Sequence, residues 1–280
     1  AVGANVSKHK VGDLVGVGCM VDSCRHCEAC AADLEQYCLQ GPTMTYATPD
    51  RVDGSNTMGG YSDSIVVSEH FVVRIPEKLD LASAAPILCA GITTYSPLKH
   101  YGVKPGDKVG ILGMGGLGHM GIKFAKALGA EVTLFTRSAS KAEEARRQGA
   151  DHVIVSTDAA QMQSVAGHFD FLLDTIPVPH DLNPYLDTLR FDGVHILVGL
   201  IEPVDPALHA GKLVMSRRVL AGSLIGGIAE TQEVLDFCAE HGITCDIEML
   251  DIRQINQAYE RMIKGDVKYR FVIDMATLKG

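Results

Sequence analysis

The chain has 280 residues, of which 46% are hydrophobic and 21% are charged, and its formal net charge is −9 at pH 7. This composition is typical of a globular chain with an ample core, in one large domain or two ordinary ones. The excess of acidic residues argues against nucleic acid or an anionic membrane as a partner. No run of eighteen apolar residues is present, so the sequence predicts no transmembrane helix.

The first ninety residues predict short strands that are separated by glycines and by a polar, cysteine-rich segment. Strand-like runs cover residues 11–18 and 61–75, and Pro76 ends the second run.

The cysteine-rich segment lies between these runs. Four of the eight cysteines fall within fifteen positions. Four thiolates so close together can hold one tetrahedral zinc ion, and such a site has no open position for substrate. A disulfide ladder suits small secreted domains, and the bacterial iron–sulfur run places its fourth cysteine after three residues and before proline, whereas here the gap is seven residues. Inert core thiols are the remaining alternative. We interpret the segment as a structural zinc lobe, which favours a reducing, cytoplasmic setting, and its ligands are Cys24, Cys27, Cys30 and Cys38.

Beyond residue 90, predicted strands and helices alternate. Helical patterns cover 117–128 and a segment in which Ser140 and Glu143 form a capping box and Gly149 ends the helix. The alternation predicts βαβ units and a parallel, doubly wound sheet. A further helix at 231–240 precedes a final strand at 269–273. The other predicted strands cover residues 108–112, 132–135, 152–155, 169–173, 194–198 and 219–224.

A glycine-rich turn joins the first of these strands to the first helix. It has the form G-x-G-x-x-G, in which glycines permit a tight turn and close approach of the backbone to a pyrophosphate. The helix that follows presents free N–H groups and its positive dipole end to the phosphates. A plain strand–helix turn is the alternative, but the strand before and the helix after favour dinucleotide binding. The residues are Gly113, Met114, Gly115, Gly116, Leu117 and Gly118.

The end of the next strand indicates which dinucleotide binds. An NAD site carries an acidic residue there for the ribose 2′-hydroxyl. This strand instead ends in Thr136, Arg137 and Ser138, with Lys141 close behind. Hydroxyls and cations suit a 2′-phosphate, although Arg137 and Lys141 could also be ordinary solvated charges. We predict NADP as the cofactor.

These motifs, in this order, resemble the zinc-dependent medium-chain alcohol dehydrogenases. The chain is most similar to their cinnamyl alcohol dehydrogenase branch and its bacterial NADP-dependent aldehyde reductases. The resemblance also rests on the runs at 59–62, 88–98, 222–227 and 269–274. It implies a partial GroES-like catalytic domain at 1–91, an NADP-binding Rossmann domain at 92–228 and a return to the catalytic domain at 229–280.

In that family, the cysteine of the Cys-Ala-Gly run, here Cys89, binds a second, catalytic zinc that polarises the substrate oxygen. From the residue alone, an inert core thiol is the commoner interpretation. The family's other two ligands, an earlier cysteine and a Gly-His-Glu run, have no counterpart in this sequence. We therefore expect that an N-terminal segment is missing and that the chain as given does not turn over.

The resemblance also implies a set of further contacts to the cofactor. Thr93 is expected near the nicotinamide ribose, and Arg270 near the phosphates. Packing at strand ends is the alternative for the hydrophobic members of the set. The edge strand at 219–227 is expected to pair in a homodimer. The residues expected to line the nicotinamide half are Thr175, Val198, Gly199, Ser223 and Ile225.

The sequence therefore predicts an NADP-dependent zinc enzyme that interconverts primary alcohols and aldehydes. Two alternatives remain: a zinc-independent quinone or enoyl reductase of the same superfamily, which typically lacks the lobe and the cysteine at position 89, and a non-catalytic NADP-binding protein.

Overall fold

The computed structural model describes residues 1–279, and it consists of two compact units. One unit contains residues 93–224. The other contains residues 1–92 and the segment that begins at Ile225.

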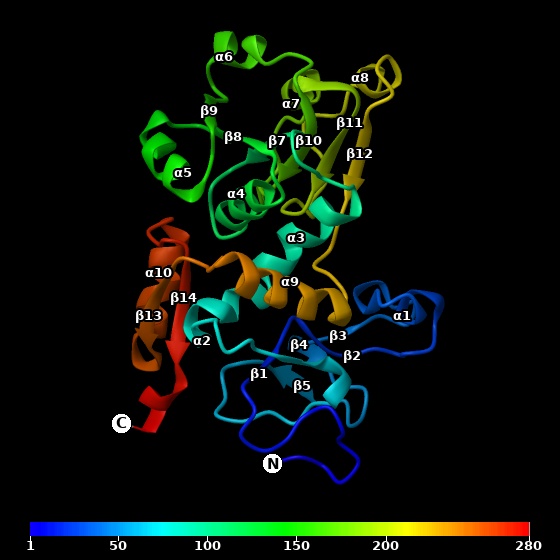
Figure 1. Ribbon diagram of the computed structural model, residues 1–280, viewed down its shortest axis with the longest axis vertical. Coiled ribbons are helices and arrows are strands. Elements are labelled where there is room, and N and C mark those ends of the chain that lie inside the picture. The colour runs from blue at the N-terminus through cyan, green and yellow to red at the C-terminus, as the bar shows by residue number, and fades with distance from the viewer. Residues whose placement is uncertain (280) are drawn as a thin grey trace. The chain divides into compact units, whose positions relative to one another are not determined.

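The unit of residues 93–224 is built on a six-stranded parallel sheet in the order β12-β11-β10-β7-β8-β9 (Figure 1). The strand order reverses between β7 and β10, which is the switch point where doubly wound sheets bind ligands. The predicted doubly wound fold is confirmed. The strands are β7 (Lys108–Leu112), β8 (Glu131–Thr136), β9 (His152–Val155), β10 (Phe169–Asp174), β11 (Leu189–Leu197) and β12 (Val219–Gly222).

Helices connect these strands, and the predicted helix after the glycine turn is confirmed as α4. The predicted capping box is wrong, because the helix begins after a short 3-10 turn, η4 (Ala139–Lys141), and the cap belongs to that turn. There the Ser138 side chain accepts from the N–H of Ser140. The helices are α3 (Ala90–His100), α4 (Gly118–Ala127), α5 (Ala142–Gln148), α6 (Ala159–Ser164), α7 (Asn183–Thr188) and α8 (Gly211–Val214).

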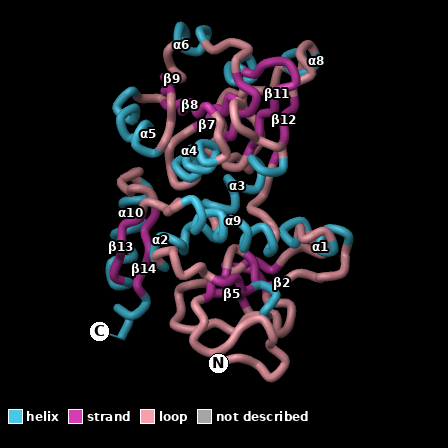
Figure 2. Tube along the Cα trace, in the orientation of Figure 1, coloured by secondary structure: helices cyan, strands magenta, loops and turns pink. Residues whose placement is uncertain are grey.

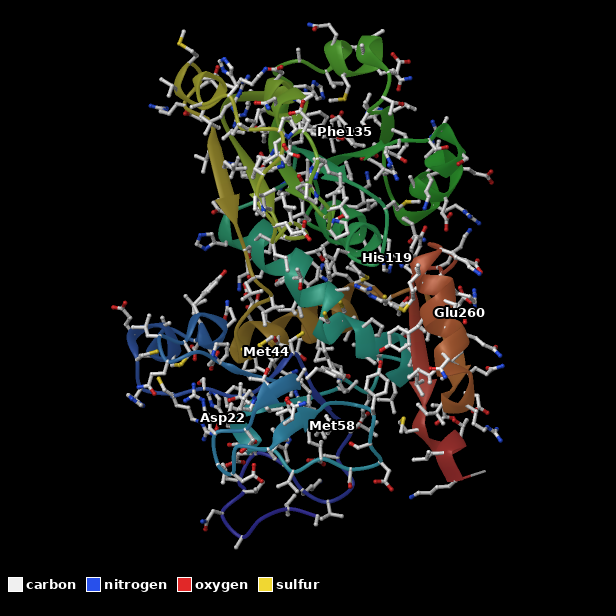
Figure 3. All side chains as sticks on the ribbon, turned by 180° about the vertical axis from the view of Figure 1, so that it is seen from behind. Asp22, Met44, Met58, His119, Phe135 and Glu260 are labelled. Carbon is white, nitrogen blue, oxygen red and sulfur yellow. The ribbon has the colours of Figure 1, made fainter. Side chains whose placement is uncertain are left out.

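The core of this unit packs around the central strands. Phe135 on β8 and Phe169 on β10 meet edge to face with ring centroids 5.2 Å apart, and both are buried. Figure 3 labels Phe135 among the side chains of the sheet. Edge-to-face contact adds to the stabilisation from burial of the rings. This packing joins β8 to the start of β10 within the core of the sheet.

The other unit is made of two-stranded sheets and short helices, and the predicted strand at 61–75 is present only at its end, as β6. Its strands from the first ninety residues are β1 (Val15–Val17), β2 (Met20–Asp22), β3 (Thr43–Met44), β4 (Tyr46–Pro49), β5 (Asn56–Met58) and β6 (Val72–Arg74). Its short helices there are α1 (Glu28–Ala31), η1 (Glu35–Tyr37), η2 (Glu69–Phe71), α2 (Leu81–Ala84) and η3 (Ala85–Leu88).

The C-terminal part of the same unit begins with α9 (Ile228–His241), which the sequence predicted a few residues shorter. The final strand β14 (Arg270–Asp274) pairs in parallel with β13 (Ile247–Asp251), and α10 (Ile255–Ile263) connects the two (Figure 2). The sequence prediction missed β13 and α10. The 3-10 turns η5 (Ile252–Gln254) and η6 (Met275–Lys279) complete the described chain.

Within residues 1–279, no single helix is long and apolar enough to cross a membrane. One pair of helices, Leu81–Leu88 and Ala90–His100, meets the length and composition requirements only when taken together, and it is bent by 55°.

Candidate cofactor and metal sites

The glycine turn lies at the switch point of the sheet, at the carboxyl end of β7. Gly113 has φ +85°, a conformation that favours glycine, and its N–H donates to the Phe135 carbonyl at 3.0 Å. This bond holds the turn against the end of β8. Helix α4 then begins at Gly118, and His119, labelled in Figure 3, is buried against the turn with its backbone N–H 3.1 Å from the Gly115 carbonyl.

Two glycines of the turn differ in what surrounds them. A Cβ on Gly118 would lie 2.0 Å from the Gly113 carbonyl oxygen, so only glycine lets the helix approach the turn. A Cβ on Gly115 would meet nothing within 4 Å, and this residue is exposed. The turn thus presents bare backbone to open space at the N-terminus of a helix, an arrangement that fits a pyrophosphate.

Residues at the end of β10 complete the switch point. The Thr175 hydroxyl donates to the Leu112 carbonyl at 2.7 Å, which ties β10 to β7. The N–H groups of Val198 and Gly199 donate to the Asp174 carbonyl at 3.0 and 3.2 Å, which ties β11 to β10. Three of the residues predicted to line the nicotinamide half therefore gather at one edge of the sheet.

The end of β8 carries the group of residues predicted to receive the 2′-phosphate. The hydroxyls of Ser138 and Ser140 lie 2.9 Å apart, and the Ser138 N–H is 3.3 Å from the Thr136 hydroxyl. Arg137 and Lys141 are exposed, and among residues 1–279 neither forms an ion pair. Hydroxyls and two uncommitted cations on one short turn suit a phosphate dianion. No carboxylate occurs from Thr136 to Lys141.

The four lobe cysteines come together in the other unit. Their Sγ atoms all lie within 4.8 Å of one another, and those of Cys24 and Cys30 are 3.9 Å apart. Four sulfur ligands at about 2.3 Å from a central zinc ion would be separated from one another by nearly the distance between the Cys24 and Cys30 sulfurs. The four residues therefore fit a zinc ion. Cys30 lies on α1, and Cys38 directly follows η1.

Backbone N–H groups in the lobe stabilise a thiolate, the form of cysteine that binds a metal cation. The N–H groups of Cys30 and Leu39 lower the pKa of the Cys27 thiol to about 6. Burial raises the pKa of the Cys30 thiol to about 11, so this sulfur requires a nearby cation to be a thiolate at neutral pH. The cysteines therefore favour a bound metal over four free thiols.

Cys89 lies between η3 and α3, and its thiol contacts a residue to which the sequence gave no role. The hydrogen bond from Cys19 lowers the pKa of Cys89 to about 6, against the effect of burial, and the charge of Arg270 acts in the same direction as the bond. The same bond and burial raise the pKa of Cys19. Cys19 also lies 3.6 Å from the Leu88 carbonyl.

The described residues do not fit a three-ligand catalytic zinc at Cys89. Among residues 1–279, the lobe is the one group of three or more histidine, cysteine or acidic side chains close enough to hold a metal. The other predicted cofactor residues are Thr93, buried on α3; Ser223, whose N–H donates to the Leu197 carbonyl at 3.0 Å; and Ile225 and Arg270, which belong to the unit of Cys89.

Sequence reasoning missed two features of these sites. Cys19 had no motif to mark it, and 70 positions separate it from Cys89. Asp174 is buried directly before Thr175, where it accepts hydrogen bonds from His180 and His195. An acidic residue at the end of an apolar strand was the one signal that could have pointed to it.

The fold and the glycine turn define a dehydrogenase with a Rossmann unit, and the lobe places it among the zinc-containing ones. Comparison with known proteins agrees. Residues 1–77 match the alcohol dehydrogenase GroES-like domain, and residues 116–240 match the zinc-binding dehydrogenase domain. The chain belongs to the family of zinc-binding alcohol dehydrogenases.

Several relatives are similar over nearly the whole chain. Aldehyde reductase YahK of Escherichia coli is 54% identical over 279 residues, which cover 99% of this chain and 80% of the relative. A cinnamyl alcohol dehydrogenase structure from Sorghum bicolor has a TM-score of 0.95 at 46% identity, covering 99% of this chain and 78% of that one. The cinnamyl alcohol dehydrogenase of Helicobacter pylori in complex with NADP(H) has a TM-score of 0.90 at 43% identity, covering 98% and 78%.

Proposed function

We propose that this protein is an NADP-dependent oxidoreductase that interconverts primary alcohols and aldehydes and carries a structural zinc ion. The observation that carries the proposal is the switch-point turn, bare at Gly115, beside a β8 end that has two free cations and no carboxylate. The names of the aldehyde reductase and of the NADP(H)-bound relative agree with it.

The residues of the Rossmann unit would hold the cofactor along the carboxyl edge of its sheet. The turn from Gly113 to Gly118 would receive the pyrophosphate, because the space beside Gly115 is open and the positive end of the α4 dipole lies at this turn. The 2′-phosphate would be bound by Thr136, Arg137, Ser138 and Lys141. The nicotinamide half would be lined by Thr93, Thr175, Val198, Gly199 and Ser223. The cofactor contacts of Ile225 and Arg270, which belong to the other unit, stay predictions from the family resemblance.

Hydride transfer is the chemistry that NADP(H) supplies when it is bound. Cys89 would lie where the alcohol or aldehyde oxygen reacts. Its sulfur, which lies beside Cys19, would provide one ligand for the catalytic zinc implied by the family. The lobe would stay outside the chemistry, because four protein ligands leave no open position on its metal.

Further proposals concern the oligomeric state, the cellular location and the partners of the protein. Among the described residues the edge strand β12 pairs only with β11; Val219 on β12 is 44% exposed and Phe191 on β11 is 66% exposed. An apolar edge of this kind supports a homodimer through the Rossmann units. Four thiolates held as metal ligands support a reducing, cytoplasmic setting. The acidic charge argues against nucleic acid or anionic membranes as partners.

Cofactor titration tests the proposal without turnover. NADPH and NADH are titrated onto the protein and binding is followed by nicotinamide fluorescence. We expect NADPH to bind more tightly, and the double variant R137A/K141A to lose this preference, because each charge-assisted contact contributes about 1.5–3 kcal/mol, or about tenfold to a hundredfold in affinity.

The double variant R146A/R147A is the matched control, since it removes two exposed cations from the last turn of α5. It should retain the preference for NADPH. Equal affinities for the two cofactors in the unaltered protein, or a preference that survives R137A/K141A, would contradict the assignment.

A further inference from the structure

A cluster of one buried acid and two histidines lies at the switch point, and the proposed reaction does not use it. Asp174 ends β10, and its side chain is fully buried. Its Oδ2 accepts from Nε2 of His180 and from Nε2 of His195, each at 2.9 Å, and its Oδ1 accepts from the Ile176 N–H at 3.1 Å. All of these residues belong to the Rossmann unit.

His180 closes the segment that follows β10 into a loop. Its Nε2 meets the Asp174 carboxylate, and its Nδ1 meets the Val178 carbonyl at 2.9 Å. Pro177 and Pro179 fix φ on either side of Val178 and restrict the residue before each of them, so the exposed part of the segment is stiff. Residues 175–180, the switch-point loop, are therefore held at both ends by one carboxylate.

The hydrogen bonds determine the protonation state of the His180 ring. Both partners of its ring, a carboxylate and a carbonyl, accept hydrogen bonds and donate none, so both ring nitrogens must carry a proton. A neutral imidazole satisfies only one of them. His195 differs, because within residues 1–279 its buried Nδ1 has no hydrogen-bond partner. An N–H at that nitrogen would be left unpaired, so the geometry assigns the positive charge to His180.

The groups around His180 favour this charge. Asp174 raises the pKa of His180 through its hydrogen bond, burial opposes the shift, and the Val178 carbonyl and Asp181 also raise it. The Tyr185 ring on α7 lies 6.1 Å from the His180 ring, centroid to centroid. Burial opposes ionisation of Asp174, but the bonds from His180 and His195 hold the pKa of that carboxyl below its usual value. These shifts agree with the hydrogen-bond geometry, in which His180 is an imidazolium beside the Asp174 carboxylate.

The loop also touches the cofactor turn. The Thr175 hydroxyl bonds the Leu112 carbonyl and lies 3.5 Å from that of Gly113. A Cβ on Gly199 would lie 2.6 Å from the Thr175 carbonyl carbon, so the backbones of these two residues are closely packed. A shift of the Thr175 backbone would therefore also displace Gly199. We propose that the His180 imidazolium is a positioning residue that holds residues 175–180 for NADP(H), so that cofactor affinity falls when His180 loses its proton.

The direction of the effect follows from the raised pKa. A group with a raised pKa gives its full stabilisation below the unfolded value of about 6.5 and loses it as pH rises through the folded value. NADPH affinity should therefore be highest while His180 is protonated and fall as pH rises through the raised pKa of its ring. The inference rests on the proposed NADP site.

The test combines a spectroscopic measurement with a binding profile. Histidine ring ¹⁵N–¹H correlation spectra of the protein, with H180Q for assignment, follow the protonation of His180. NADPH dissociation constants are measured from pH 6.5 to 9.5 for the unaltered protein, H180Q and H152Q. The last variant is the matched control, because His152 is an exposed histidine at the start of β9, the opposite end from the switch point.

We expect a doubly protonated His180 at pH 7.5 and an approximately tenfold weakening of NADPH binding, with its midpoint at the pH where that ring titrates. H180Q should bind weakly at all pH values, and H152Q should follow the unaltered protein. A neutral His180 at pH 7, or a binding midpoint that differs from the ring titration, overturns the inference even if H180Q does not fold. Failure of the unaltered protein to bind NADPH at any pH would instead overturn the proposed cofactor, while the ring titration would still report on the loop.

Discussion

Substitution of alanine for either of two glycines in the cofactor turn, Gly118 or Gly115, should separate the structural role of the turn from its role in binding NADPH. In G118A, the new Cβ would lie 2.0 Å from the Gly113 carbonyl oxygen and 3.2 Å from the Thr175 hydroxyl. Van der Waals contact needs more than 3 Å, and the blocking atom is backbone, so α4 or the turn must shift by about 1 Å. Overpacking of this kind costs about 1–3 kcal/mol.

In G115A, the new methyl group would meet nothing within 4 Å, so the folded state should accept it. The same methyl group would occupy the space that a pyrophosphate must enter. The loss of one charge-assisted hydrogen bond would weaken NADPH binding by about tenfold to a hundredfold.

The assay pairs thermal unfolding with NADPH titration. For G118A we expect a lower Tm, by about 2–4 °C for each kcal/mol lost, together with weaker NADPH binding. For G115A we expect an unchanged Tm and weaker binding alone. An unchanged Tm in G118A would refute the packing argument, and normal NADPH affinity in G115A would refute the location of the phosphate site.

Three further predictions follow from the two units. Residues 1–280 should contain one zinc ion per chain by elemental analysis, and C27S should lose it while NADPH binding persists; equal zinc content in C27S would exclude the lobe as the site. In an active form of the protein, C89A should abolish aldehyde reduction but leave NADPH binding unchanged, and full activity in C89A would contradict the role given to this residue. Asp158 caps α6. Hydrogen bonds from the backbone and side chain of Gln161, and from the N–H of Ala160, lower the pKa of Asp158, so its contribution to stability should be present at neutral pH and lost as pH falls through that lowered value. D158A should therefore lower Tm at pH 7 and do so by less as the pH falls, and a decrease in Tm that does not change with pH would contradict the cap.

Short-range patterns in the sequence determined the class of fold and the kinds of site. The strand, glycine turn and α4 are contiguous, so the spacing of Gly113 and Gly118 specifies the turn by itself. The lobe cysteines fall within fifteen residues, and a loop that short can close around one ion wherever the rest of the chain lies. The alternation of strands and helices predicted the parallel sheet for the same reason.

Tertiary structure decided what depends on residues that are distant in the sequence. Cys19 meets Cys89 because separate segments pack together, and no local pattern records that contact. Asp174 joins His180 and His195 because β10 and β11 pair in register, which places His195 opposite Leu172 and beside the carboxylate two residues further on. Strand β13 has no alternating pattern and exists because β14 supplies its partner. Residue types and spacing specify local geometry, whereas the protonation of a buried pair such as Asp174 and His180 depends on neighbours that only the folded chain assembles.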